Sequence, residues 1–172
     1  MKHLTVDEIM DFVSIVDDNV FRIVIPYLDI TTAVYIIRTE EGVMIFDTAG
    51  GDSDINEYVL PVLEDLKIEP ESVKYIFISH NHRDHARGLR RLLEVIPNAV
   101  VVSRSEALMS DYSDYGFIFP EDGHTLMSVL QVVTIPGHTL DSSAILDTRT
   151  KTLITADCLQ LVGIFGSGDW AC

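Results

Sequence analysis

Short apolar stretches recur along the chain, many of them with period-two alternation, and predict β-strands. The predicted strands cover residues 20–24, 33–38, 42–47, 73–79, 99–102, 130–135, 143–147 and 152–155. Turn-forming residues at 40–42 and at 148–151 separate neighbouring stretches, so each of these segments predicts a hairpin.

Longer stretches with apolar residues three and four apart predict helices. The predicted helices cover residues 55–66, 86–96 and 104–109. Pro97 ends the second helix, Ser103 or Ser105 could cap the third, and the aromatic segment 111–119 is predicted to be irregular. Strands come first, then alternating helices and strands, then strands again. This order predicts a single α+β domain over residues 1–172, with mixed sheets and helices on their outer faces.

Composition narrows the class of protein. Hydrophobic residues make up 47% of the 172 residues, enough for a core. A formal net charge of −15 disfavours nucleic acid and anionic membranes as partners. Two cysteines, Cys158 and Cys172, are too few for a disulfide framework and indicate a reducing compartment. Because we find neither a secretion signal nor an apolar run of ~18 residues, we expect a cytoplasmic protein.

Residues 80–85, with the sequence HNHRDH, contain three histidines and one aspartate. A buried group of imidazoles and a carboxylate needs partners, so this density favours a metal site over a solvated polar loop. In an extended loop His80 and His82 point the same way and can share one ion. Asp84 and His85, where the chain turns into the next helix, can face a second ion. These ligands suit zinc, iron, nickel or cobalt better than calcium or magnesium.

Two further candidate ligands follow predicted strands. His138 comes after strand 130–135, and Asp157 comes after strand 152–155, as the histidine cluster comes after strand 73–79. Taken alone, the histidine could be a capped turn residue and the aspartate a strand-end turn residue. Their joint occurrence with the cluster predicts one shared metal site at an edge of the sheets, held by regular elements.

Four segments together carry a resemblance to a known family. HNHRDH fits the signature H-x-H-x-D-H, and it stands in order with FDTAG at 46–50, PGHT at 136–139 and TAD at 155–157. Over residues 20–165, roughly, the chain resembles the metallo-β-lactamase superfamily, and within it the metal-dependent hydrolases of glyoxalase II and lactonase type. The resemblance implies an αββα sandwich with metal ions at one edge of the two sheets.

The resemblance also implies roles for particular residues. A first ion would be held by His80, His82 and His138, a second by Asp84 and His85, and Asp157 would bridge them. Asp84 would also be catalytic, and Asp47 would support the metal loop by hydrogen bonding. The expected cofactor is zinc, as one or two ions, with iron, manganese or nickel as alternatives.

The chain departs from the family pattern at its end. Family members normally continue well past the bridging aspartate, adding strands, a helix and a final histidine for the second ion. This sequence stops at Cys172, and neither His3 nor His124 stands where that histidine belongs; His124 lies in a predicted turn. We therefore expect a C-terminally truncated sandwich, from a longer protein, or an incomplete second site. A homodimer could cover the open sheet edge.

The expected reaction is hydrolysis of a small ester, thioester or lactone through a metal-bound hydroxide, with Asp84 orienting the nucleophile. Two alternatives stay open: a mononuclear-iron persulfide-oxidising enzyme of the same fold, and a catalytically idle metal-binding fragment that dimerises. His82 at the second signature position disfavours the oxygen-reducing di-iron members. Cys158 is predicted to be a buried structural thiol. The aromatic segment 111–119 could line a pocket, but a packed surface loop is favoured.

Overall fold

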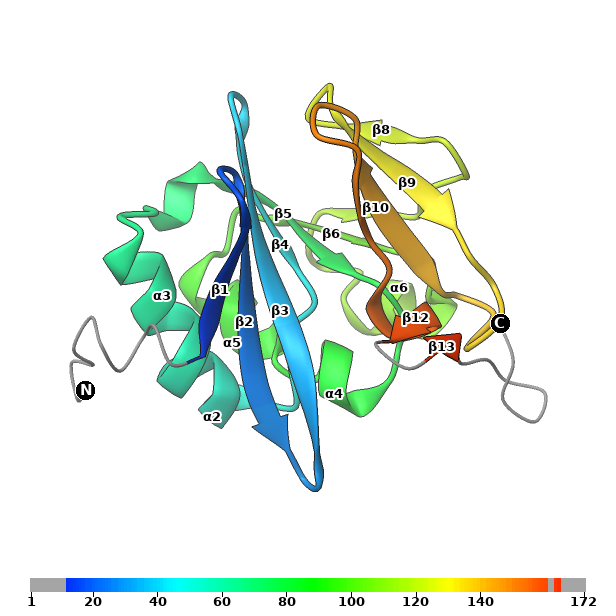
Figure 1. The fold of residues 1–172 in the computed structure, drawn as a ribbon. Coiled ribbons are helices and arrows are strands. Elements are labelled where there is room, and N and C mark those ends of the chain that lie inside the picture. The colour runs from blue at the N-terminus through cyan, green and yellow to red at the C-terminus, as the bar shows by residue number, and fades with distance from the viewer. Residues whose placement is uncertain (1–11, 161–162, 165–172) are drawn as a thin grey trace.

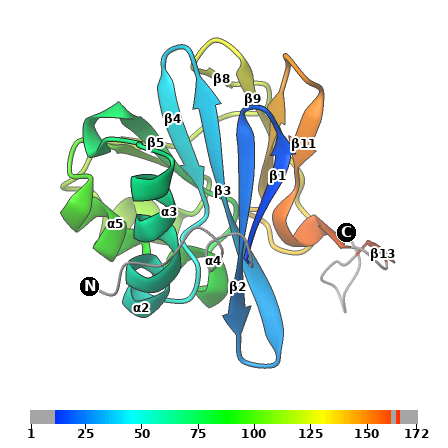
Figure 2. The same ribbon diagram turned by 60° about the vertical axis from the view of Figure 1, so that its left-hand side comes forward.

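A computed structural model describes residues 12–160 and 163–164 of the chain. Two β-sheets face each other, and helices cover the far side of the larger one (Figures 1 and 2). The larger sheet has the order β1-β2-β3-β4-β5-β6-β7. Its strands are β1 (Val13–Asp17), β2 (Val20–Tyr27), β3 (Ile30–Thr39), β4 (Gly42–Phe46), β5 (Val73–Ile78), β6 (Val100–Ser103) and β7 (Phe117–Ile118). Pairing is antiparallel from β1 to β4 and parallel from β4 to β7.

The smaller sheet is antiparallel, with the order β11-β10-β9-β8. Its strands are β8 (Thr125–Leu126), β9 (Leu130–Thr134), β10 (Ser143–Asp147) and β11 (Thr152–Ile154). A two-stranded ribbon of β12 (Leu159–Gln160) and β13 (Gly163–Ile164) follows it. The helices are α2 (Asp52–Asp54), a π-helical turn (Ile55–Val59), α3 (Leu60–Asp65), α4 (Arg83–Ala86), α5 (Leu89–Val95) and α6 (Glu106–Asp111), with 3-10 turns at Pro70–Ser72 and Ala156–Cys158.

Two hydrophobic cores hold these layers together. The first lies between the helices and the larger sheet, where the apolar faces of α3 and α5 meet alternate residues of β2 to β6. The second lies between the two sheets, where the rings of Phe46 and Phe77 stack with centroids 5.2 Å apart and contact the apolar side chains of β9 and β10. The described residues thus supply a helical layer and both sheets of the expected αββα sandwich.

Polar contacts tie the two sheets at the end where β3 and β10 finish. Arg149, in the turn after β10, donates to the Asp147 carboxylate at 2.6 Å and to the carbonyl oxygen of Arg38 on β3 at 2.8 Å. Thr152 on β11 donates to the Asp17 carboxylate on β1 at 3.0 Å. These contacts fix the separation of the sheets at that end, opposite the ends of β5 and β9.

Several sequence predictions need correction. The segment 111–119 is not wholly irregular, because residues 117–118 form β7 and pair with β6. The sequence pattern also missed β1, whose short run of residues is exposed on both faces and carries no clear alternation. The predicted start of the third helix is also corrected: α6 begins at Glu106 rather than at residue 104. Ser105 is the N-cap, and the Ser105 hydroxyl accepts from the amide of Leu108.

The two longer predicted helices are also interrupted. The helix predicted over 55–66 begins earlier, at Asp52. Its residues Ile55–Val59 form the π-helical turn, which comes just before Pro61, a residue with no amide hydrogen to donate. The predicted helix over 86–96 is instead two helices, α4 and α5, separated at Gly88. A Cβ at Gly88 would lie 2.1 Å from the carbonyl oxygen of Thr48, so only glycine allows this close approach of two backbones.

Candidate metal centre

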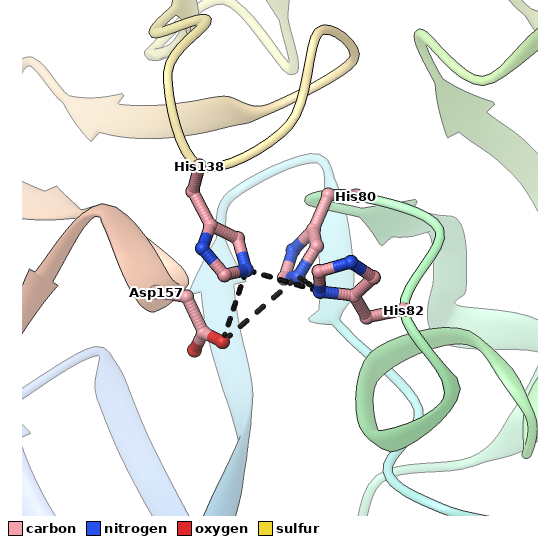
Figure 3. Close-up of side chains that lie close together, drawn as sticks. All are labelled: His80, His82, His138 and Asp157. Carbon is pink, nitrogen blue, oxygen red and sulfur yellow. Dashed lines mark hydrogen bonds and ion pairs between the residues drawn. The ribbon is translucent and has the colours of Figure 1, made fainter. Parts of the chain in front are cut away.

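Three strands from the two sheets end at one edge of the sandwich, and each is followed by candidate ligands. The loop after β5 carries His80 and His82, the loop after β9 carries His138, and the turn after β11 carries Asp157. Figure 3 shows the four side chains pointing toward one another from these separate segments. Their ligand atoms all lie within 4.8 Å of one another, which is the spacing of groups that can hold one ion.

In this first group, three ring nitrogens converge. His82 Nδ1 lies 3.0 Å from His80 Nε2 and 3.0 Å from His138 Nε2. The Oδ2 atom of Asp157 lies 3.9 Å from His80 Nε2 and 3.5 Å from His138 Nε2. His80 is buried, whereas His82 is exposed, so the group opens to solvent on the His82 side.

Asp84, His85 and Asp157 form a second group, again with ligand atoms within 4.8 Å of one another. His85 Nε2 lies 3.5 Å from Asp84 Oδ2 and 3.2 Å from Asp157 Oδ1. This nitrogen is buried and has no hydrogen-bond partner within the described part of the chain. A buried imidazole nitrogen facing two carboxylates fits a transition-metal ion, which would satisfy it. The single carboxylate of Asp157 turns one oxygen to each group.

Asp47 supports both groups from beneath. Its carboxylate accepts from the Ser79 amide at 2.8 Å and from the Ser79 hydroxyl at 2.9 Å, and it lies 2.7 Å from His85 Nδ1. The Ser79 hydroxyl is in turn 2.9 Å from His80 Nδ1. One buried aspartate therefore orients a histidine of each group, which leaves the other ring nitrogen of each imidazole for an ion. This is the supporting position that the sequence resemblance implied.

The backbone that carries the second group is held at two carbonyls. Thr48 donates to the carbonyl oxygen of His85 through its amide at 2.7 Å and its hydroxyl at 2.9 Å. Thr32 on β3 donates to the carbonyl oxygen of Asp84 at 2.8 Å. Sequence reasoning missed both threonines and Ser79. Thr48 lies within the segment FDTAG and Ser79 directly precedes HNHRDH, but Thr32 lies 52 residues from its partner and no local pattern marks it.

The charges of the site are strongly coupled. Burial lowers the pKa of His80 to about 3. Burial would also lower the pKa of His85, but the charge and hydrogen bond of Asp47 at Nδ1 and the Asp157 and Asp84 carboxylates near Nε2 outweigh it and raise this pKa to about 12. For Asp157, burial would raise the pKa, but the nearby His85 imidazole and its charge dominate and lower it to about 2. In the metal-free protein, His85 thus holds a proton where an ion would bind.

The remaining predicted residues lie apart from this centre. His124 is an exposed turn residue before β8, and His3 and Cys172 lie outside the described residues. Cys158 is buried, as predicted, and its thiol contacts the carbonyl oxygen of Ile135 at 3.5 Å. In the aromatic segment, Tyr112 and Phe117 pack against the first core, in agreement with the favoured interpretation of a packed surface segment.

Comparisons with known proteins agree with this geometry. The family model described as the metallo-beta-lactamase superfamily matches residues 29–170. An atrochrysone carboxyl ACP thioesterase from Claviceps purpurea is 28% identical over 129 residues, covering 73% of this chain and 39% of the relative. An N-acyl homoserine lactonase from a Bacillus species is 26% identical over 164 residues, covering 76% of this chain and 64% of the relative. The flavodiiron protein from Giardia intestinalis has a similar fold, with a TM-score of 0.69, 19% identity and coverage of 84% of this chain and 40% of that one.

The chain therefore belongs to the metallo-beta-lactamase superfamily, a family of metal-binding αββα sandwiches. It spans well under half the length of the first curated relative it matches. Within the described residues, every helix is too short or too polar to cross a membrane.

Proposed function

We propose that the protein is a metal-dependent hydrolase of a small ester, thioester or lactone. The observation that carries the proposal is the pair of ligand groups sharing Asp157, in a chain whose relatives include a thioesterase and a lactonase. His80, His82 and His138 would hold one ion, and Asp84 and His85 a second, with Asp157 between them. Zinc, bound there, would lower the pKa of a coordinated water and polarise the substrate carbonyl.

The protein's own residues determine access and proton transfer. Substrate would approach over His82, because the exposed side of the first group lies there while His80 and His85 are buried. Asp84 is half-buried; burial would raise the pKa of its carboxyl, but the nearby His85 imidazole dominates and lowers it. Asp84 is therefore ionised at neutral pH and can orient the attacking water and accept its proton.

An alternative use of the same atoms, covalent catalysis by a serine, is disfavoured. Ser79 lies beside His80 and Asp47, which is superficially the arrangement of a nucleophile with its base. Its side chain sits in the floor of the site, and the residue is 1% exposed, so its hydroxyl has no access to a substrate carbonyl. Ser79 acts as a support for His80 instead.

The direct test is to strip the purified full chain with a chelator and reload it with Zn²⁺, Mn²⁺ or Fe²⁺. We expect hydrolysis of an acyl thioester, an aryl ester or an N-acyl homoserine lactone to return with metal, together with about two ions per chain. One iron per chain with oxygen consumption on a persulfide would instead identify the oxidising alternative. Tightly bound metal with no turnover on any of these substrates would identify an idle metal-binding chain.

A further inference from the structure

The two histidine loops come from different sheets, so something must hold them in register before an ion can bind. His80 and His82 follow β5 of the larger sheet, and His138 follows β9 of the smaller one. At the base of the loops, the amide of Ser143 donates to the carbonyl oxygen of Ser79 at 2.9 Å. This bond joins the sheets below the site, but it leaves the upper parts of both loops to be fixed by other contacts.

Asp141 makes the contact between the upper parts of the loops. Its Oδ2 atom accepts from the backbone amide of Asn81 at 3.0 Å, across 60 residues of sequence. Asn81 stands between His80 and His82, so this amide belongs to the peptide segment that spaces the two imidazoles. A carboxylate that accepts from a backbone amide makes a charge-assisted bond, which is stronger and more directional than a neutral one.

Hydrogen bonds within its own loop connect Asp141 to the segment that carries His138. The amide of Thr139 donates to the hydroxyl of Ser142 at 3.1 Å, and their two hydroxyls are 2.7 Å apart. The amides of Gly137 and Ser142 both donate to the carbonyl oxygen of Thr139. Residues 137–142 therefore form a closed, internally bonded turn that connects Asp141 to His138.

We propose that Asp141 is a positioning residue that locks the His138 loop onto the His80–His82 loop. It holds the three imidazole nitrogens at ion-binding spacing before the ion arrives. This inference rests on the proposed metal site, and it assigns no contact between Asp141 and substrate or ion. Removal of such a support usually weakens metal affinity by about 10-fold to 100-fold.

The test compares Asp141→Ala with a matched control, Asp122→Ala, in the full chain. Asp122 is also a loop aspartate, and it accepts from the Thr134 amide at 2.8 Å, so its contact is to β9 itself and does not join the two histidine loops. The probe is Co²⁺, whose affinity is measured by competition and by its visible spectrum. We expect Asp141→Ala to weaken Co²⁺ binding by about 10-fold or more and Asp122→Ala to leave it unchanged.

Two further variants separate positioning from simple charge attraction. Asp141→Asn keeps an oxygen that can accept from Asn81 but removes the charge, so it should restore most of the affinity. In a His138→Ala background, Asp141→Ala should have almost no further effect, because it acts through that histidine. Wild-type affinity in Asp141→Ala, equal losses in the alanine and asparagine variants, or an undiminished loss in the His138→Ala background would each overturn the proposal.

The readout is binding, so the outcome is separable from that of the proposed hydrolysis. Normal Co²⁺ binding by the unmodified chain without turnover on any substrate would reject hydrolysis and leave the role of Asp141 standing. No Co²⁺ binding by the unmodified chain would overturn both. Melting temperatures of the metal-free variants complete the comparison, because a merely structural aspartate would lower stability without a selective loss of Co²⁺ affinity.

Discussion

The two groups of candidate ligands in the proposed metal centre are built in different ways. His80, His82 and His138 reach a common point from two sheets, and their rings meet at an opening to solvent. Asp84 and His85 come from a single turn of α4. Asp47 holds the His85 ring, Thr48 holds the His85 carbonyl, and Thr32 holds the Asp84 carbonyl. The first group depends on how two loops are placed, whereas the second depends on a buried network of charges. Mutations and pH should therefore affect the two groups unequally.

The largest expected effect is the loss of a ligand from the first group. His138→Ala removes one of three converging nitrogens, so we expect metal content to fall and hydrolysis to drop by about a thousandfold or more, since metal activation contributes several kcal/mol. His82→Ala should behave in the same way. His124→Ala, at an exposed histidine outside the site, is the matched control and should be fully active. A His138→Ala protein with undiminished metal and turnover would exclude the first group as the metal site.

A smaller effect is expected when the second group loses its charge at Asp84. Asp84→Asn leaves the three histidines intact, so at least one ion should stay bound. Turnover should fall by about 100-fold, because a positioned proton acceptor usually contributes that much or more. Metal analysis together with steady-state kinetics checks this. Unchanged turnover would show that Asp84 plays no part in the reaction.

The pH dependence of metal binding should separate the groups further. His85 has a pKa near 12 in the metal-free protein, far above its ordinary value of 6.5, so it is protonated at neutral pH and must release that proton to bind an ion. Affinity at the second group should therefore rise about tenfold per pH unit between pH 6 and 8. His80 has a pKa of about 3 and is already neutral in this range, so its binding releases no proton. Titration calorimetry in buffers of different ionisation enthalpy counts the released protons; equal release at both groups would contradict this comparison.

The same raised pKa fixes the sign of a stability effect. Because folding raises the pKa of His85, its protonation stabilises the metal-free fold fully below pH 6.5. That stabilisation is lost as the pH rises toward 12. Bound metal should remove this dependence, because the ion replaces the proton. Thermal melts of the metal-free and loaded proteins across alkaline pH give the measurement.

The smallest expected effect is that of Asp47→Asn. The amide can still accept a hydrogen bond, but it orients the His85 ring less firmly and leaves Nε2 a weaker ligand. This loss should outweigh the easier release of the His85 proton, so affinity at the second group should weaken by about tenfold while the first changes less. Co²⁺ titration with separate spectral signals for the two groups tests this. If the first group weakened more than the second, the role assigned to Asp47 would be wrong.

The sequence predicts best what is encoded locally. The cluster at 80–85 lies within six consecutive residues, and the strands that precede the candidate ligands, 73–79, 130–135 and 152–155, have strong apolar patterns, so the shared edge could be anticipated. The strand β7 has two residues and β1 has exposed faces, so neither produces a readable period. The break at Gly88 depends on the distance to Thr48, and the contacts of Thr32 and Asp141 join segments 52 and 60 residues apart. Such contacts exist only once the sheets are assembled.

Asp157 presents Oδ1 to His85 and Oδ2 to His80 and His138, so a single carboxylate serves both groups. An ion bound at either position would consequently alter the electrostatic environment of the other. Thermodynamic reciprocity then requires that the first ion change the affinity for the second by the same factor in whichever order they are loaded. The pair would thus behave as one coupled equilibrium, and Asp157→Asn, which removes the shared charge, should change the coupling factor between the two loading steps.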